Sequence, residues 1–134
     1  MDLEIRSPMN TESASILLVD DVLPFHDVFG LFLREAGYFV GCAENGLAGL
    51  RMFKEGVWDL VITDLAMPEM GGEELAEEIR KISADVPLIL ITGSQRSDAR
   101  VGLFDEILEK PFSRNDLLTA TAKALQKASL RRIG

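Results

Sequence analysis

Short apolar runs alternate with stretches of helical periodicity along most of this 134-residue chain. The runs are rich in Val, Ile and Leu, which is typical of buried strands. The stretches between them repeat apolar residues every three or four positions, which indicates helices with one buried face. This alternation predicts βα units around a parallel sheet. The predicted strands are Ile16–Val19, Tyr38–Cys42, Leu60–Thr63, Leu88–Ile91 and the short run Ile107–Leu108.

Start and stop signals define most of the predicted helices. The first begins near Pro24 and ends at Gly37, since proline suits a first turn and glycine a C-terminal cap. Asn45 and Ser113 are the predicted N-caps of the second and the last helix. The polar stretch Ser94–Phe104 has only a weak apolar stripe, and we predict a short fourth helix there. The predicted buried stripe of the first helix consists of Phe25, Val28, Phe29, Phe32, Leu33 and Ala36.

Helices are predicted to cover both faces of the sheet. The strand runs are almost uninterrupted by polar residues, whereas a strand with one solvated face would alternate. A third helix after the loop LAMPEMGG, with right-handed crossovers, completes a three-layer α/β sandwich. Residues 1–14 are polar and are predicted to form a flexible tail, so the folded domain is expected to span residues 15–134.

Composition narrows the possible surroundings and partners. The 14 basic and 22 acidic residues give a net charge of −8, which argues against binding to nucleic acid or to an anionic membrane. The single cysteine, Cys42, cannot form an internal disulfide, and no apolar stretch approaches the length of a membrane span. The amino terminus lacks the apolar segment of a secretory signal. We therefore predict a soluble cytoplasmic protein that binds neither nucleic acid nor membranes.

Polar side chains follow the predicted strands at positions far apart in the sequence. Asp20 and Asp21 follow the first strand, and Asp64 follows the third. Thr92 closes the fourth strand, and Lys110 comes just after the fifth. The carboxyl ends of parallel strands lie along one edge, where ligands bind, so these residues are expected to converge on one pocket.

The chemistry of this pocket indicates a divalent cation and a phosphoryl group. Taken singly, each residue has an ordinary explanation, because an aspartate after a strand often caps a helix or forms a turn. Together, three carboxylates repel one another, so without a cation at least one of them should have a raised pKa. An oxygen-only site that also receives a phosphoryl group favours Mg²⁺.

Four blocks of sequence resemble a known family. LLVDD, VITDLAMPEMGG, LILITGS and EKPF, in this order, are similar to the receiver domain of two-component response regulators. The resemblance extends from Ser15 to about Leu130, nearly the whole chain. It implies a flavodoxin-like fold with five parallel strands in the order 2-1-3-4-5.

The resemblance implies a role for each residue of the pocket. Asp64 would be the phosphoacceptor, taking its phosphoryl group from a histidine kinase or a histidine phosphotransfer protein. Asp20, Asp21 and Asp64 would hold Mg²⁺ together with the backbone carbonyl of Ala66. Such a domain is a signalling module rather than an enzyme, since its chemistry is limited to its own phosphorylation and dephosphorylation.

Two further residues of the pocket would act on the phosphoryl oxygens. Lys110 would pair with one oxygen, and the Thr92 hydroxyl would bind another only after modification, which makes it the switch. The peptide bond between Lys110 and Pro111 is implied to be cis, whereas only about 5–6% of X–Pro bonds are cis in folded proteins.

The sequence departs from the family pattern in one region. Ile107 replaces the usual aromatic residue three positions before the lysine, and the interval from Thr92 to Lys110 is shorter by about four residues, roughly one helical turn. Both changes fall on the face formed by the fourth helix, the fifth strand and the last helix, through which the family binds downstream partners. We therefore expect the stretch Ser94–Phe104 to carry any switching motion.

Other functions are compatible with parts of the pattern. A flavodoxin-type nucleotide binder would need a phosphate cradle after the first strand, where VDDVLP places two acids instead. An aspartyl-phosphate phosphatase would need a second acid at Ala66. A degenerate receiver that acts only as an interaction module, or a receiver excised from a hybrid histidine kinase, stays open as an alternative.

Overall fold

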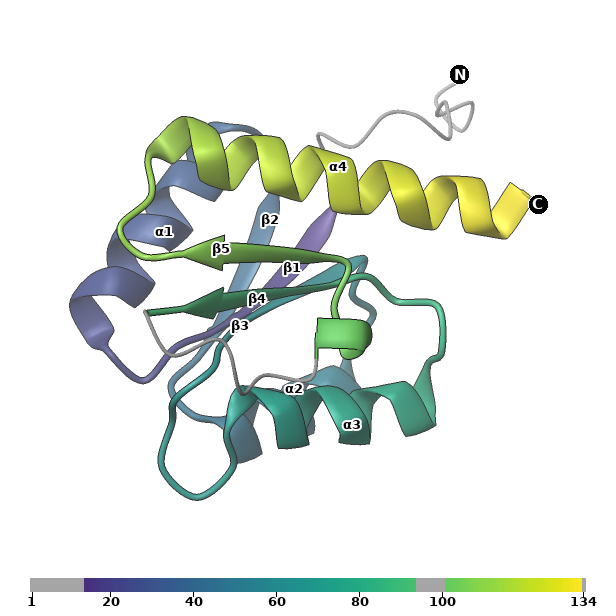
Figure 1. The fold of residues 1–134 in the computed structure, drawn as a ribbon, viewed down its shortest axis with the longest axis horizontal. Coiled ribbons are helices and arrows are strands. Elements are labelled where there is room, and N and C mark those ends of the chain that lie inside the picture. Colours follow the sequence, from purple (N-terminus) through teal and green to yellow (C-terminus); the bar gives the residue numbers. More distant parts are fainter. Residues whose placement is uncertain (1–13, 94–100, 134) are drawn as a thin grey trace.

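Five parallel strands form a single sheet in the order β2-β1-β3-β4-β5 (Figure 1). The structure is a computed structural model that describes residues 14–93 and 101–133. Each of the five strands lies within one or two residues of its predicted position, so the predicted fold class and strand order are confirmed. The strands are β1 (Ser15–Val19), β2 (Phe39–Ala43), β3 (Leu60–Asp64), β4 (Leu88–Thr92) and β5 (Glu106–Glu109).

Helices cover both faces of the sheet, which completes the three predicted layers. On one face lie α1 (Leu23–Glu35) and α4 (Arg114–Ile133), and on the other lie α2 (Gly46–Glu55) and α3 (Gly72–Ile82) (Figure 1). Within the described ranges, no helix is both long enough and apolar enough to cross a membrane.

The predicted fourth helix is only partly within the described residues. Residues 94–100 lie outside them, and Val101–Leu103 form a single 3-10 turn, η2, rather than an α-helix. Residues 1–13 of the predicted tail also lie outside the described part, whereas Ala14 is buried and its carbonyl accepts a hydrogen bond from the Phe39 amide.

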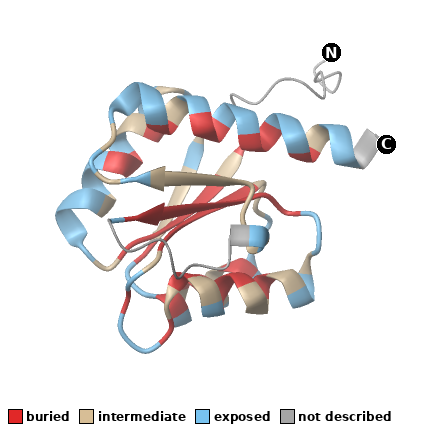
Figure 2. Ribbon diagram, in the orientation of Figure 1, coloured by how far each residue is buried: buried red, intermediate tan, exposed pale blue. Residues whose placement is uncertain are grey.

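Buried residues occupy the central strands and parts of the helices (Figure 2). Alternation of the strand side chains divides this core into two layers. Ile16 and Leu18 of β1 face the layer under α1 and α4, while Leu17 and Val19 face the layer under α2 and α3. Successive strand side chains point to opposite faces, so a run of consecutive apolar residues is required when both faces are covered. The prediction from uninterrupted apolar runs is therefore confirmed.

Both predicted N-caps are present. The Asn45 side-chain oxygen accepts a hydrogen bond from the Ala48 amide at 2.7 Å. At the start of α4, the Ser113 hydroxyl accepts from the Asp116 amide and the Asp116 carboxylate accepts from the Ser113 amide, both at 3.0 Å. This reciprocal pair satisfies two amides that a helix start leaves without partners, and it fixes the start of α4 four residues after Lys110.

One part of the predicted core is wrong. Phe29 and Leu33 of α1 are buried as predicted, but Phe25 and Val28 are 41% and 44% exposed. The first turns of α1 extend beyond the carboxyl ends of the strands, so the sheet does not cover them (Figure 1). Helical spacing placed these residues on one face of the helix, but the length of the sheet decides how much of that face is buried.

Candidate functional site

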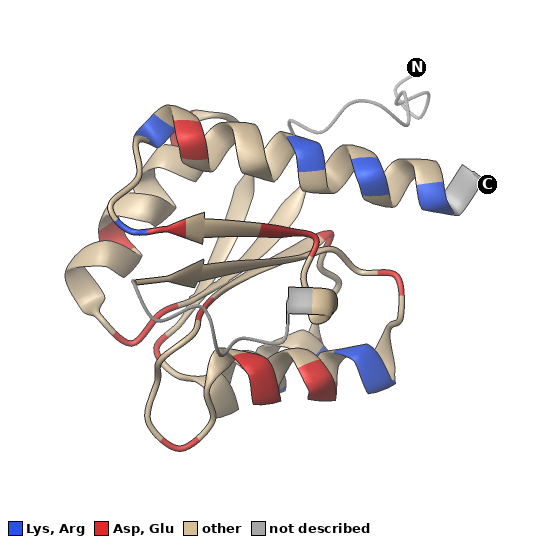
Figure 3. Cartoon of the chain, viewed as in Figure 1, with Lys and Arg blue, Asp and Glu red and all other residues tan. Residues whose placement is uncertain are grey.

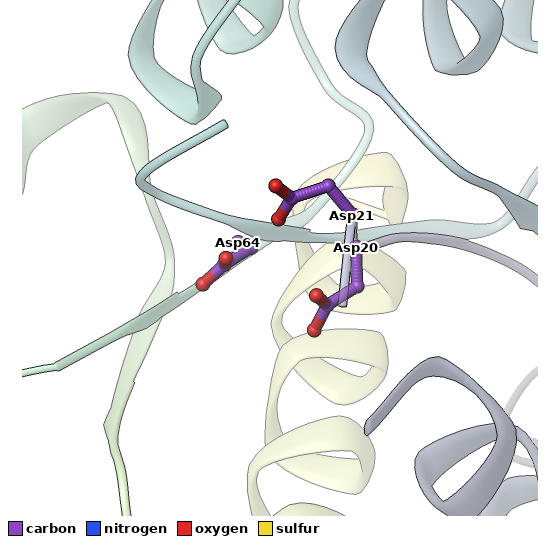
Figure 4. Close-up of side chains that lie close together, drawn as sticks. All are labelled: Asp20, Asp21 and Asp64. Atoms are coloured by element: carbon purple, nitrogen blue, oxygen red, sulfur yellow. The ribbon is translucent and has the colours of Figure 1, made fainter. Parts of the chain in front are cut away.

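Three carboxylates lie together at the carboxyl edge of the sheet (Figure 4). Asp20 and Asp21 come directly after β1, and Asp64 is the last residue of β3, which pairs with β1. One oxygen from each carboxylate lies within 4.8 Å of the other two. The sequence separation of more than forty residues is closed by the pairing of these two strands, so the predicted convergence is confirmed for the three aspartates.

Two of these carboxylates are buried and Asp21 is partly buried, and their hydrogen bonding within the described residues is incomplete. Asp20 is fully buried, and Asp64 is 6% exposed. One oxygen of Asp20 accepts a hydrogen bond from the Val22 amide at 2.9 Å. Its other oxygen, Oδ2, and Oδ1 of Asp21 have no donor among the described residues. Buried oxygens without donors are costly unless a cation compensates them, so this donor set fits a hard divalent ion such as Mg²⁺.

Burial and mutual repulsion perturb the acids of the cluster. The pKa of Asp64 is raised to about 6, chiefly by burial and then by the negative charge of Asp20, while Lys110 acts in the opposite direction. The pKa of Asp20 is also raised, chiefly by burial, although its hydrogen bond from the Val22 amide opposes this. The expected raised pKa is therefore present, and the cluster is electrostatically unfavourable when it holds only its own charges.

Lys110 and Thr92 reach the same edge from the neighbouring strands. Lys110 Nζ lies 3.6 Å from Asp64 Oδ1, and the Lys110 amide donates to the Thr92 carbonyl at 2.7 Å. Thr92 is 1% exposed, and its hydroxyl has no partner among the described residues. The peptide bond from Lys110 to Pro111 is cis, as the resemblance implied. A cation and a free hydroxyl thus accompany the three carboxylates.

The loop after Asp64 folds back tightly beneath the site. The Gly72 amide donates to the Leu65 carbonyl at 2.9 Å, and a Cβ at Gly72 would lie 2.4 Å from the Asp64 carbonyl oxygen. Only glycine allows this approach, so Gly72, the last residue of LAMPEMGG, has a steric role that sequence reasoning did not assign. Ala66 lies in this loop and is exposed, and the role of its carbonyl as a metal ligand stays a prediction.

Sequence reasoning also missed a contact of Lys110. The ammonium lies 4.3 Å from the centroid of the Phe25 ring, a residue that periodicity had placed in the core. No local signal links the two residues, because they are 85 positions apart in the chain. Their contact depends on how α1 lies against the segment after β5.

Comparison with known proteins assigns the family. Residues 16–122 match the model of the response regulator receiver domain. The transcriptional regulatory protein GlrR of Escherichia coli is 36% identical over 126 residues, which cover 90% of this chain and 28% of GlrR. A CpxR homolog of Haemophilus influenzae is 37% identical over 120 residues, covering 87% of this chain and 52% of that protein. The chain thus spans about a quarter to a half of the length of these relatives.

Solved structures agree with this assignment. Response regulator protein TrrA of Thermotoga maritima, in complex with Mg²⁺ and BeF, superposes with a TM-score of 0.78 at 38% identity, covering 83% of this chain and 98% of that chain. A receiver domain protein of Clostridium thermocellum has a TM-score of 0.78 at 32% identity and covers 89% and 96%. The chain therefore belongs to the response regulator receiver domain family of two-component signalling.

Proposed function

We propose that the chain takes a phosphoryl group onto Asp64 from a phosphohistidine of a histidine kinase or a histidine phosphotransfer protein, and that this modification changes its binding to a downstream partner. One observation carries the proposal. Three carboxylate oxygens within 4.8 Å, an ammonium 3.6 Å from Asp64 and a buried hydroxyl share one edge of the sheet. Phosphoryl transfer to a carboxylate needs a metal site, a nucleophile and groups that bind the phosphoryl oxygens. These residues can supply all three.

The proposed step uses the Asp64 carboxylate as the nucleophile. One of its oxygens forms a bond to phosphorus, the bond from phosphorus to the donor imidazole nitrogen breaks, and the electron pair of that bond stays on the imidazole. With a pKa of about 6, Asp64 is mostly ionised at pH 7. Lys110 lies where it can neutralise an oxygen of the incoming group. This self-modification is the only catalysis that we propose.

Asp20, Asp21, Asp64 and the Ala66 carbonyl would hold Mg²⁺. When bound, the ion neutralises charge on the transferring group, which is the main source of catalysis in phosphoryl transfer. Two observations support this assignment: buried oxygens of Asp20 and Asp21 have no donor in the described part of the chain, and the pKa of Asp64 is raised. The complex of TrrA with Mg²⁺ and BeF shows that a related receiver binds this ion.

For the output, we propose the face formed by β5 and α4. The stretch Ser94–Phe104, which the sequence predicts to carry the switching motion, lies partly outside the described residues. A groove of about 240 Å³ runs between β5 and α4 on this face and includes Ile107. Ile107 is only partly buried and is stiff at its first side-chain torsion, so a large rotamer change there is not expected to carry the signal. The Thr92 hydroxyl, which is buried and has no partner among the described residues, is the proposed link between the phosphoryl group and this face.

The domain boundaries and surroundings are also proposals. We assign residues 15–134 to the receiver domain, with a cytoplasmic location and no nucleic acid contact by the domain itself. The net charge of −8 supports the last point. The name of GlrR describes it as a transcriptional regulatory protein, but this chain matches only 28% of its length.

Labelling by a small phosphodonor tests the proposed function. With acetyl phosphate and Mg²⁺, the intact mass should rise by one phosphoryl group, and EDTA should prevent this. Asp64→Asn should not be labelled, because an amide is a poor nucleophile. Asp59→Asn is the matched control, since Asp59 precedes the same strand at the opposite edge and binds the Ser15 amide. Labelling that persists in Asp64→Asn or in EDTA contradicts the assignment, and an unlabelled wild type favours the interaction module.

A further inference from the structure

Lys110 is held between two groups of different chemistry. Its ammonium lies 3.6 Å from the Asp64 carboxylate and 4.3 Å from the centre of the Phe25 ring. The side chain of Lys110 is 22% exposed. A cation over an aromatic face is attracted by the ring quadrupole, and the attraction grows as water is removed. Phe25 therefore stabilises an ammonium position beside the acidic cluster.

The ring that supports Lys110 is itself held in place. Phe25 stacks on Phe29 with ring centres 5.8 Å apart and an interplanar angle of 13°. Phe29 is buried and packs against Phe112 at 4.9 Å. Phe112 follows Lys110 by two positions, so the contacts form a closed loop from Lys110 through three rings and back to its own segment. This packing orients the exposed Phe25 ring, since it has a rigid neighbour beneath it.

We propose that Phe25 is a positioning residue for Lys110 in phosphoryl transfer to Asp64. A lysine side chain is long, flexible and strongly hydrated, so a free ammonium would spend much of its time in water. The Phe25 face restricts it to the neighbourhood of the acceptor before any phosphoryl group arrives. This inference rests on the proposed function for its catalytic consequence, but the contact itself can be tested without phosphorylation.

Nuclear magnetic resonance of the Lys110 side chain tests the contact. The ε-methylene protons of Lys110, assigned with Lys110→Arg, should be shifted upfield by the Phe25 ring current. Phe25→Leu should remove this shift, while Phe25→Tyr, which keeps the aromatic face, should retain it. These spectra need neither Mg²⁺ nor a phosphodonor. A Lys110 signal at the ordinary lysine position in the wild type, or one unchanged in Phe25→Leu, overturns the proposal.

The rate of labelling by acetyl phosphate tests the catalytic consequence. Phe25→Leu should be labelled roughly threefold to tenfold more slowly, which corresponds to the usual range of a cation–π contact. Phe25→Tyr should restore the wild-type rate. Phe32→Leu is the matched control, because the Phe32 ring lines the same apolar cavity as Phe25 but makes its cation contact with the Arg114 guanidinium, at 6.0 Å, instead of with Lys110. Circular dichroism and urea unfolding should show that all variants fold.

Failure of this inference differs from failure of the proposed function. If the wild type is not labelled at all, the proposed function fails, while the spectra still report on the contact. If the wild type is labelled and Phe25→Leu reacts at the same rate, the positioning role is wrong. Slower transfer to Phe25→Leu from a protein donor alone, with unchanged labelling by acetyl phosphate, would also overturn it, because Phe25 would then act by contacting the donor.

Discussion

The two edges of the sheet both place aspartates beside strand ends, but these carboxylates have different surroundings. At the amino edge, Asp105 precedes β5 and accepts a hydrogen bond from the Leu88 amide at 2.9 Å. Its two oxygens also pair with Arg80 at 3.4 Å and Arg131 at 3.1 Å. At the carboxyl edge, the Lys110 ammonium pairs with Asp64, and buried oxygens of Asp20 and Asp21 have no donor among the described residues.

The amino edge connects several elements through its charges. Arg80 of α3 also donates to the Leu103 carbonyl, and Lys127 of α4 pairs with Glu106 at 2.7 Å. Figure 3 shows the basic side of α4 beside the acidic start of β5. Satisfied charges of this kind stabilise the fold, whereas buried acids without donors indicate a binding site. The same residue type therefore stabilises the fold at one edge and forms the proposed metal site at the other.

The largest expected effect is at the amino edge. Asp105→Ala should lower the free energy of unfolding by about 3 kcal/mol, because two arginines and the Leu88 amide lose a partly buried partner. Urea unfolding followed by circular dichroism measures this, and labelling of Asp64 should persist. Glu78→Ala is the control, since its exposed pair with Lys81 should contribute less than about 0.5 kcal/mol. A loss no larger than that of the control would contradict the comparison.

At the carboxyl edge, removing a charge should raise the free energy of unfolding instead of lowering it. The pKa of Asp64 is about 6 in the folded chain and 3.8 in the reference state. Between these values the folded chain holds a proton that the unfolded chain has released, so stability falls as the pH rises through this range. Above pH 6 the whole penalty is present, and below about pH 3.8 it is absent. In EDTA, Asp64→Asn should therefore be more stable than the wild type by about 2–3 kcal/mol at pH 7.

This gain should disappear on acidification. The stability difference between Asp64→Asn and the wild type should shrink between pH 6 and pH 3.8, which urea unfolding at several pH values can follow. Asp105→Asn should lose stability at pH 7 under the same conditions. An Asp64→Asn variant that is less stable than the wild type at pH 7 would show that the acidic cluster is not electrostatically unfavourable.

Binding of Mg²⁺ should offset the electrostatic repulsion within the acidic cluster, with a smaller effect on stability than the substitution of Asp64. At ten times its dissociation constant, the ion should stabilise the wild type by about 1.4 kcal/mol. Asp21→Asn should lose most of this stabilisation, because one of the three carboxylates is replaced by a neutral amide. Asp105→Ala should keep the response despite its lower stability. Thermal unfolding with and without Mg²⁺ distinguishes these outcomes, and an equal response in Asp21→Asn would place the ion elsewhere.

The smallest expected difference in stability is between substitutions of two buried threonines, which are the most closely matched pair. The Thr63 hydroxyl donates to the Asp64 carbonyl at 2.9 Å, whereas the Thr92 hydroxyl has no partner within the described ranges. Thr63→Val should cost about 1 kcal/mol because it removes a buried hydrogen bond. Thr92→Val should change stability by less than about 0.5 kcal/mol, or slightly increase it. Equal losses in urea unfolding would mean that the Thr92 hydroxyl is satisfied in the folded chain.

Local sequence was sufficient for the five strands and for the N-caps of α2 and α4, but not for the predicted fourth helix, where Val101–Leu103 form a 3-10 turn. Uninterrupted apolar runs identify five strands because both faces of the sheet are covered, and Asn45 and Ser113 define helix starts through bonds within three residues. The aspartates after β1 and β3 lie at one edge because parallel strands align their carboxyl ends, and the adjacency of β1 and β3 brings their carboxylates together.

Tertiary structure decided which surfaces these residues meet. Helical spacing predicted that Phe25 is buried. The sheet does not reach the first turns of α1, so the Phe25 ring is partly exposed and contacts the Lys110 ammonium. Asp105 carries no sequence signal for its role, because its partners come from α3, α4 and β4. Periodicity and capping depend on neighbours within about one turn of the chain, whereas burial and ion pairing depend on residues that only folding brings together.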